Sequence, residues 1–178
     1  VEQYIQRILG HVEGKDAMHV QHSTAIRIKK AIQGLTAKQL KWKPEPGKWS
    51  IAEIMAHLAD AEIVASWRFR SIIGQNGVSI QAFDQDAWAR VFDYPNRDAN
   101  LSLEVFRVLR ENNMAMLKSL PRETWENYGM HQERGKETVA HLTRMFAGHD
   151  TNHALQIEGI AGQLKKKPKG KSKKTGRK

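Results

Sequence analysis

The sequence predicts an all-α fold, a bundle of four long helices. In four stretches, apolar residues recur at the three- and four-residue spacing of an amphipathic helix, and helix-start and helix-end signals bound these stretches. No alternating apolar run is long enough to indicate a sheet. A chain of 178 residues fits one domain, which we place at residues 1–164. The four long helices are expected at about residues 16–33, 51–73, 101–120 and 137–162.

The N-terminal part is expected to contain one short and one long helix. Apolar residues at helical spacing predict a short amphipathic helix within residues 2–13. Gly34 is well placed to end the first long helix, because glycine readily takes the left-handed conformation that follows many helices. Thr36 and Gln39 form a capping box, which predicts one further turn. Residues 43–47 contain two prolines and a glycine and are therefore expected to form a loop.

The clearest helix-start signal in the chain precedes the second long helix. Ser50 and Glu53 form a capping box, in which the serine oxygen accepts from the Glu53 N–H and the glutamate reaches back. Trp49 precedes the cap and Ile54 lies four residues into the helix, which is the pairing of a hydrophobic staple. The helix is expected to stop at Gly74.

Residues 74–99 are expected to form a long irregular connection, because they contain few periodic apolar positions. Long structured loops in compact domains are often functional. Phe83, Trp88 and Tyr94 in this connection either cover the mouth of a pocket or pack into the core, and we favour the core. A third long helix follows and ends before Pro121.

Composition excludes several classes of protein. The chain has no cysteine, so it has no disulfide, no zinc–thiolate or thiolate-held iron–sulfur cluster and no cysteine nucleophile. This composition suits a cytoplasmic protein, and any metal must be held by histidine or carboxylate. No apolar run approaches the roughly 20 residues that a membrane helix needs, and no secretory signal pattern is visible.

The net charge of +10 is concentrated at the C-terminus. Residues 165–178 carry eight lysines, one arginine and no acid, so the remaining 164 residues have a net charge of only +1. A basic tail without apolar residues cannot bury anything and is expected to be disordered. It provides either a solubilising extension, which we favour, or weak nonspecific attraction to nucleic acid.

Two histidines occupy the apolar side of the last long helix. On a helical wheel with Leu142 at zero, His149 and His153 lie at about −20° and 20°, within the stripe that contains Phe146 and Ile157. Side chains four residues apart on a helix are neighbours, so both rings can reach one ion. A buried imidazole costs free energy unless its donor and acceptor are satisfied, and a divalent cation would satisfy both rings.

A third candidate ligand lies on the second long helix. His57 is at the shoulder of that helix's apolar stripe, close to its beginning. Helices pack about 8–10 Å apart, so His57 can complete a three-histidine metal site. The alternative is three core histidines bonded to carbonyls or to one another, and we favour the metal. The other five histidines are not expected to bind metal. His19 and His22 lie three residues apart on one helix but are expected at the surface, and His11, His131 and His141 have no partner at ligand spacing.

Two sequence motifs resemble one known family. Residues 48–53 (KWSIAE) precede residues 57–62 (HLADAE), and an H-x3-H-x2-Q-I pattern covers residues 149–157. Residues 44–47 and 14–16 also match. On these residues the chain resembles the DinB-like superfamily, over nearly all of its first 164 positions.

The resemblance implies a four-helix bundle with an unusual long crossover and a divalent metal held by His57, His149 and His153. Family members with a known role include S-transferases and isomerases that use low-molecular-weight thiols, and many others are described only as metal-dependent hydrolases. The family often forms homodimers. The metal would be zinc, nickel or iron, and it would lower the pKa of a bound water or thiol. The expected substrate is therefore a small molecule.

Three further residues are candidates for positioning the metal ligands or the substrate. Gln156 shares the core side of its helix with the two histidines, and Asp60 follows His57 by nearly one turn. Asp60 either holds a ring N–H or is a solvated acid. Trp49 can line the pocket, although the staple already explains it. Asp150 and Glu62 are expected to be structural or surface residues.

Three functions remain open at this point. The first is a thiol-dependent S-transferase, with a metal-dependent hydrolase as its alternative. The second is a non-catalytic metal-binding bundle with a role in stress response. The third is contact with nucleic acid through the tail.

Overall fold

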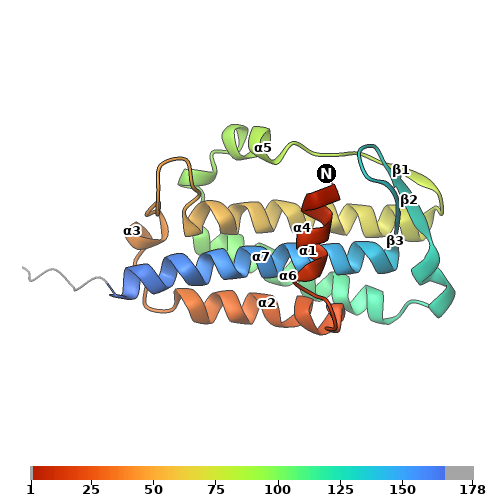
Figure 1. The fold of residues 1–178 in the computed structure, drawn as a ribbon, viewed down its shortest axis with the longest axis horizontal. Coiled ribbons are helices and arrows are strands. Elements are labelled where there is room, and N and C mark those ends of the chain that lie inside the picture. Colours follow the sequence, from red (N-terminus) through yellow and green to blue (C-terminus); the bar gives the residue numbers. More distant parts are fainter. Residues whose placement is uncertain (1, 167–178) are drawn as a thin grey trace, which may run out of the picture.

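Four long helices form the body of the protein in the computed structural model, which describes residues 2–166 (Figure 1). They are α2 (Ala17–Ile32), α4 (Ile51–Gly74), α6 (Ala99–Lys118) and α7 (Val139–Lys166). Helix α2 packs against α7 and α6, and α4 packs against α6 and α7. The predicted helical bundle is therefore confirmed, with each long helix within a few residues of its expected position.

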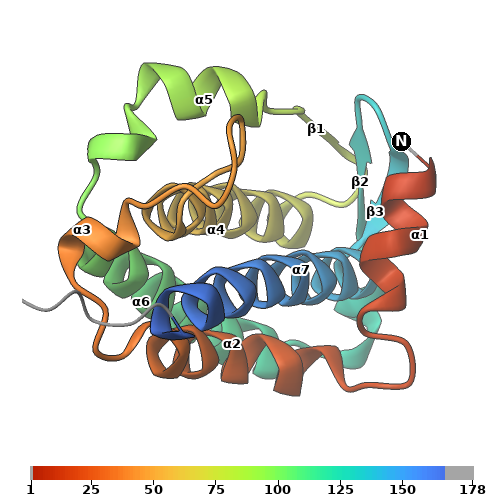
Figure 2. The same cartoon turned by 60° about the vertical axis from the view of Figure 1, so that its left-hand side comes forward.

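The helices α4 and α6 run in the same direction, so the chain between them returns along the outside of the bundle (Figure 2). This crossover holds more regular structure than expected. It contains β1 (Val78–Ile80), α5 (Gln85–Val91) and a 3-10 turn at Tyr94–Asn96. The expectation of an irregular segment is corrected, whereas the long crossover itself is present.

A small sheet closes one end of the bundle. The strands β2 (Tyr128–His131) and β3 (Gly135–Thr138) form a hairpin, and β1 pairs with β2 in parallel. The expectation that the chain forms no sheet is wrong. Strands of three or four residues are too short to show a period, and Val78 pairs with the distant Gly129.

Two short helices and a 3-10 segment at Arg122–Glu126 complete the fold. Helix α1 (Glu2–Gly10) crosses α7 so closely that a Cβ on Gly148 would lie 2.1 Å from the Ile8 carbonyl oxygen. Helix α3 (Ala37–Leu40) is the predicted single turn. Both predicted capping boxes are present, at the starts of α3 and α4. The glycine predicted to end the first long helix, Gly34, has a φ of +81°.

The buried side chains form two apolar clusters separated by a polar layer. One cluster joins the first turns of α4 to the last turns of α7, around Met55, Leu58 and Ile157. The other joins the end of α4 to the start of α7, near the sheet, around Phe69 and Leu142. Between them, histidines, acids and one arginine are buried. The site described below lies in this layer.

The C-terminal tail is described only in part. Helix α7 continues to Lys166, and Lys165 donates a hydrogen bond to the Ala31 carbonyl, with a Nζ–O distance of 2.8 Å. The expectation of disorder is therefore wrong for Lys165 and Lys166, which continue the helix, and residues 167–178 lie outside the described part of the chain. Within residues 2–166, no helix has the length and apolar composition needed to cross a membrane.

Candidate metal centre

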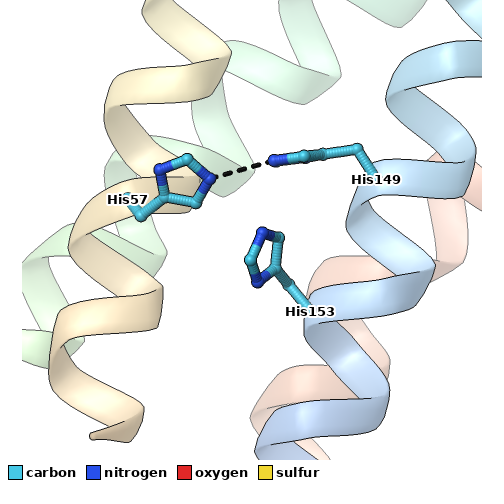
Figure 3. A group of neighbouring side chains, drawn as sticks. All are labelled: His57, His149 and His153. Atoms are coloured by element: carbon cyan, nitrogen blue, oxygen red, sulfur yellow. Dashed lines mark hydrogen bonds between the residues drawn. The ribbon is translucent and has the colours of Figure 1, made fainter. Parts of the chain in front are cut away.

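Three histidine rings from two helices converge in the polar layer. His57 projects from α4, and His149 and His153 project from α7, so that their rings face one another (Figure 3). One ring nitrogen of each lies within 4.8 Å of the others, and the Nε2 atoms of His57 and His149 are 2.9 Å apart. In the described part of the chain, no other group of three or more His, Asp or Glu side chains converges in this way. The predicted convergence is therefore present.

Burial keeps two of these rings neutral. His57 is 1% exposed and His153 is 9% exposed. Burial, and then the neighbouring His149, lower the pKa of His57 well below its usual value and that of His153 to about 3. A neutral imidazole has a free lone pair, which is what a cation requires.

Two of the three rings are oriented by neighbours on α7. The Nδ1 of His149 lies 3.1 Å from Asp150 Oδ1, and the Nδ1 of His153 lies 3.1 Å from Gln156 Oε1. Such contacts leave the Nε2 atom of each ring to face the cluster. The Nδ1 of His57 is buried without a hydrogen-bond partner.

The expected roles of Asp60 are both wrong. Its carboxylate is buried, so it is not a solvated acid, and it does not contact a histidine ring. It accepts hydrogen bonds from the Tyr94 hydroxyl and from Arg97, each at 2.8 Å. Asp60 therefore anchors the end of the crossover to α4. The expected preference of Tyr94 for the core is confirmed, because this residue is fully buried.

The other two predicted positioning residues touch the histidines from the edge of the site. Gln156 is exposed rather than on the core side, although its amide oxygen reaches His153. Trp49 packs against the apolar cluster that contains Ile54, as a staple residue would. Its ring centroid is 5.1 Å from that of His57, but Trp49 does not line the adjoining cavity.

Asp150 has a larger role than its sequence position indicated. It is 1% exposed and links His149 to Arg110, whose Nη2 lies 2.7 Å from Asp150 Oδ2. Arg110 also pairs with Glu62. Burial opposes the charge of Asp150, but Arg110 and His149 lower the pKa of this carboxyl overall. Adjacent residues on a helix point in different directions, which is why spacing did not reveal the contact between His149 and Asp150.

A cavity of about 250 Å³ adjoins the histidines. Its lining includes His57, His149, Phe146 and the crossover residue Phe83. Phe83 therefore faces the cavity, contrary to the core position that we favoured for it. The Trp88 ring packs on Phe83, with a centroid distance of 5.0 Å, and is half-buried.

Sequence reasoning missed a buried cation in the same cavity. Arg68 is 4% exposed and lines the cavity with His57. It follows His57 by eleven residues, which returns to nearly the same side of a helix. This spacing is the sequence feature that could have predicted that Arg68 lies on the same side of α4 as His57. Arg68 contacts His131, one of the five histidines not expected to bind metal, and His131 is outside the three-histidine cluster.

Comparisons with known proteins agree with this fold. A family model described as the DinB superfamily matches residues 23–157. A protein of Oceanobacillus iheyensis, named "Putative metal-dependent hydrolase", is 25% identical over 133 residues, which cover 75% of this chain and 77% of that protein. "Putative metal-dependent hydrolase YfiT" of Bacillus subtilis is 23% identical over 155 residues, which cover 85% of this chain and 86% of that protein.

A solved structure provides the same comparison in three dimensions. YfiT from Bacillus subtilis, described as having an unusual four-helix bundle topology, matches with a TM-score of 0.77 at 21% sequence identity. The match covers 84% of this chain and 86% of that chain. The family model extends over all of α4 and α6 and over most of α2 and α7. The chain therefore belongs to the DinB superfamily.

Proposed function

We propose that this protein is a metal-dependent enzyme that acts on a small molecule, with a divalent cation held by His57, His149 and His153. The observation that carries the proposal is the convergence of three ring nitrogens within 4.8 Å from two separate helices. Relatives named as metal-dependent hydrolases support it. The ion would be zinc, nickel or iron, each of which imidazole ligands accommodate.

The residues present fit such an ion. Two nitrogens that bind a tetrahedral zinc at 2.0–2.1 Å are about 3.3 Å apart. In this cluster the Nε2 atoms of His57 and His149 are 2.9 Å apart, and all three ligand nitrogens lie within 4.8 Å of one another. These distances bracket the separation that zinc requires. Among the three rings, only the Nε2 atoms of His57 and His149 lie within hydrogen-bond distance of each other. A cation between the rings would give their lone pairs a common partner, and a buried polar group without a partner costs about 1–3 kcal/mol.

The ion would supply Lewis acidity, which lowers the pKa of a water or thiol that binds to it. The chain's own groups would orient the ligands and shape the space around the reacting atom. Asp150 and Gln156 fix the rings of His149 and His153. Phe146 and Phe83 line the adjoining cavity with apolar surface.

The nucleophile separates two versions of this function. In a hydrolase it is water, which the names of the relatives favour. In an S-transferase it is a low-molecular-weight thiol, as in the S-transferases among the family members with a known role. The chain has no cysteine, so in the second version the thiol must arrive as a substrate.

Metal content is the first test. The wild-type protein is expected to bind one divalent ion per chain in elemental analysis. His57→Ala, His149→Ala and His153→Ala should each lose it, whereas His22→Ala, on the exposed side of α2, should retain it. A wild-type protein without stoichiometric metal after loading, or triad variants that keep it, would contradict the proposal.

Activity is the second test. The metal-loaded protein is screened against esters and amides, and separately against small electrophiles with a low-molecular-weight thiol. Turnover that follows metal content across the four variants identifies the reaction. Metal without any turnover would favour the non-catalytic metal-binding bundle.

Two further proposals concern partners. A homodimer is tested by sedimentation of the full chain. Weak nonspecific binding of nucleic acid through the tail is tested by truncation after Leu164, which should abolish a salt-sensitive retention on DNA. Retention unchanged by that truncation rules the tail out as its cause.

A further inference from the structure

Arg68 and the histidine cluster belong to one cavity. Arg68 and His57 both project from α4 into it, and His149 faces them from α7. Eleven residues of α-helix correspond to three turns, so the two α4 residues are about 16 Å apart along the helix axis. Arg68 and His57 therefore line the cavity at separate positions along α4.

The Arg68 guanidinium has few acceptors. Its Nη2 donates to the Gln81 carbonyl oxygen at 2.7 Å and lies 3.2 Å from His131 Nε2. The Nδ1 of His131 also lies 3.2 Å from the backbone N of Glu133. A neutral imidazole has one acceptor nitrogen, so His131 accepts from Glu133 or from Arg68 but not from both. One carbonyl and at most one ring nitrogen therefore serve a group with five N–H donors.

The carboxylates near Arg68 are engaged elsewhere or exposed. Among the described residues, none lies within ion-pair distance of Arg68. Glu137 pairs with Arg134, with a Nε–O distance of 2.7 Å. Glu133 lines the cavity but is exposed to solvent. Burial, and then Arg134, lower the pKa of Arg68 to about 10, so it remains a cation at neutral pH.

Burying a cation without a carboxylate partner costs free energy of folding, so such residues are unusual in proteins. The guanidinium fork suits a carboxylate or phosphate group, which it binds through two parallel hydrogen bonds. The Phe83 ring, whose centroid is 5.9 Å from the Arg68 Cζ, lines the same part of the cavity.

We propose that Arg68 binds an anionic group of the substrate, a carboxylate or phosphate, while the reacting end of the same molecule lies at the three histidines. The substrate is then an elongated small molecule with an anion at one end. This assignment rests on the proposed function for the position of the reacting end, and Arg68 is a specificity-determining residue for it.

The test compares two thiols that differ only in charge. The zinc-loaded full chain is titrated with 6-mercaptohexanoate and with 6-mercaptohexanol, and affinity is measured by calorimetry. The wild type is expected to bind the carboxylate at least tenfold more tightly. Arg68→Gln, which keeps a donor for the Gln81 carbonyl, should lose this preference and retain its affinity for the alcohol. Arg144→Gln, on the exposed side of α7, is the matched control.

A second readout does not require the metal. In the metal-free wild type, hexanoate should shift the Arg68 Nε–H resonance and hexanol should not. If the protein binds no zinc, the proposed function fails while this measurement still decides the role of Arg68. Equal affinities for the two thiols, a preference that survives in Arg68→Gln, or no shift with hexanoate would each overturn the proposal.

Discussion

Two buried arginines in neighbouring parts of the bundle have opposite surroundings. Arg110 is 3% exposed and Arg68 is 4% exposed. Arg110 contacts the carboxylates of Glu62 and Asp150, whereas Arg68 contacts one backbone carbonyl and the His131 ring but no carboxylate of the described residues. Burial alone would lower the pKa of Arg110, but the two acids raise it overall, while the pKa of Arg68 falls to about 10. The two arginines are equally buried, so burial does not distinguish them. The difference is that Arg110 has carboxylate partners within the protein, whereas Arg68 has none among residues 2–166 and is available to a ligand.

The largest expected effect comes from removing the paired arginine. Arg110→Met leaves Glu62 and Asp150 buried without their cation, which is expected to cost about 3–5 kcal/mol in free energy of unfolding. Arg68→Met leaves no buried carboxylate behind and is expected to cost about 1 kcal/mol, the value of one hydrogen bond. Urea denaturation of the two variants measures the difference. Equal losses would mean that the two arginines are not the contrasting pair described here.

The cavity that contains Arg68 can be altered through α1, which carries the cavity residue Tyr4. A Cβ on Gly148 would meet the Ile8 carbonyl at 2.1 Å, so Gly148→Ala is expected to displace α1 and cost about 1–3 kcal/mol. Gly159→Ala is the control, because a Cβ there has open space and should stabilise α7 by roughly 0.5–1 kcal/mol. Thermal unfolding and amide exchange in α1 measure both, and no loss in Gly148→Ala would contradict the close packing.

Asp150 contacts both Arg110, in the ion-paired group with Glu62, and His149 in the metal centre. Its substitution therefore tests whether the ion pairs affect metal binding. Asp150→Asn is expected to weaken metal affinity about 10–100-fold, because this acid orients His149. Asp60→Asn is the matched control, since Asp60 is equally buried but contacts Tyr94 and Arg97 instead. Chelator competition measures the affinities. Equal affinities in the wild type and Asp150→Asn would show that the contact has no role in binding.

The last expected effect is a dependence of stability on pH in the metal-free protein. The pKa of His153 is about 3 in the folded protein, below its ordinary value near 6.5, so the unfolded chain binds the proton first. Stability should be complete above pH 6.5 and decline as the pH falls toward 3. Melting temperatures between pH 7 and 5, above the range in which carboxylates titrate, measure the decline. It should be weaker in His153→Leu, and an unchanged slope would exclude His153 as its source.

The long helices were predictable because their signals are local. Ser50 and Glu53 mark the start of α4 within four residues of sequence, and the cap is found as expected. The three histidines were predictable because a regular helix fixes which side each residue occupies. The parallel pairing of Val78 with Gly129 was not predictable, because it depends on where the crossover returns in space.

The supporting residues were harder to predict than the histidines. Asp60 has the right spacing to hold His57, but Tyr94 and Arg97 reach its carboxylate instead. Asp150 is adjacent to His149 in sequence, a spacing that does not predict a contact on a helix, yet its carboxylate contacts the His149 ring. The direction in which a side chain leaves a helix can be deduced from sequence. Which polar group it then contacts depends on where other segments lie, and helix periodicity does not predict that.

The small sheet has a consequence for how this architecture can diversify. Gln81 directly follows β1, and His131 ends β2, so the segments that surround the Arg68 guanidinium belong to the sheet and its margins. The three histidines, in contrast, project from α4 and α7, which pack against each other and against α1, α2 and α6. Changes in strand length or hairpin sequence are therefore expected to alter the surroundings of Arg68 while leaving the histidine cluster unchanged.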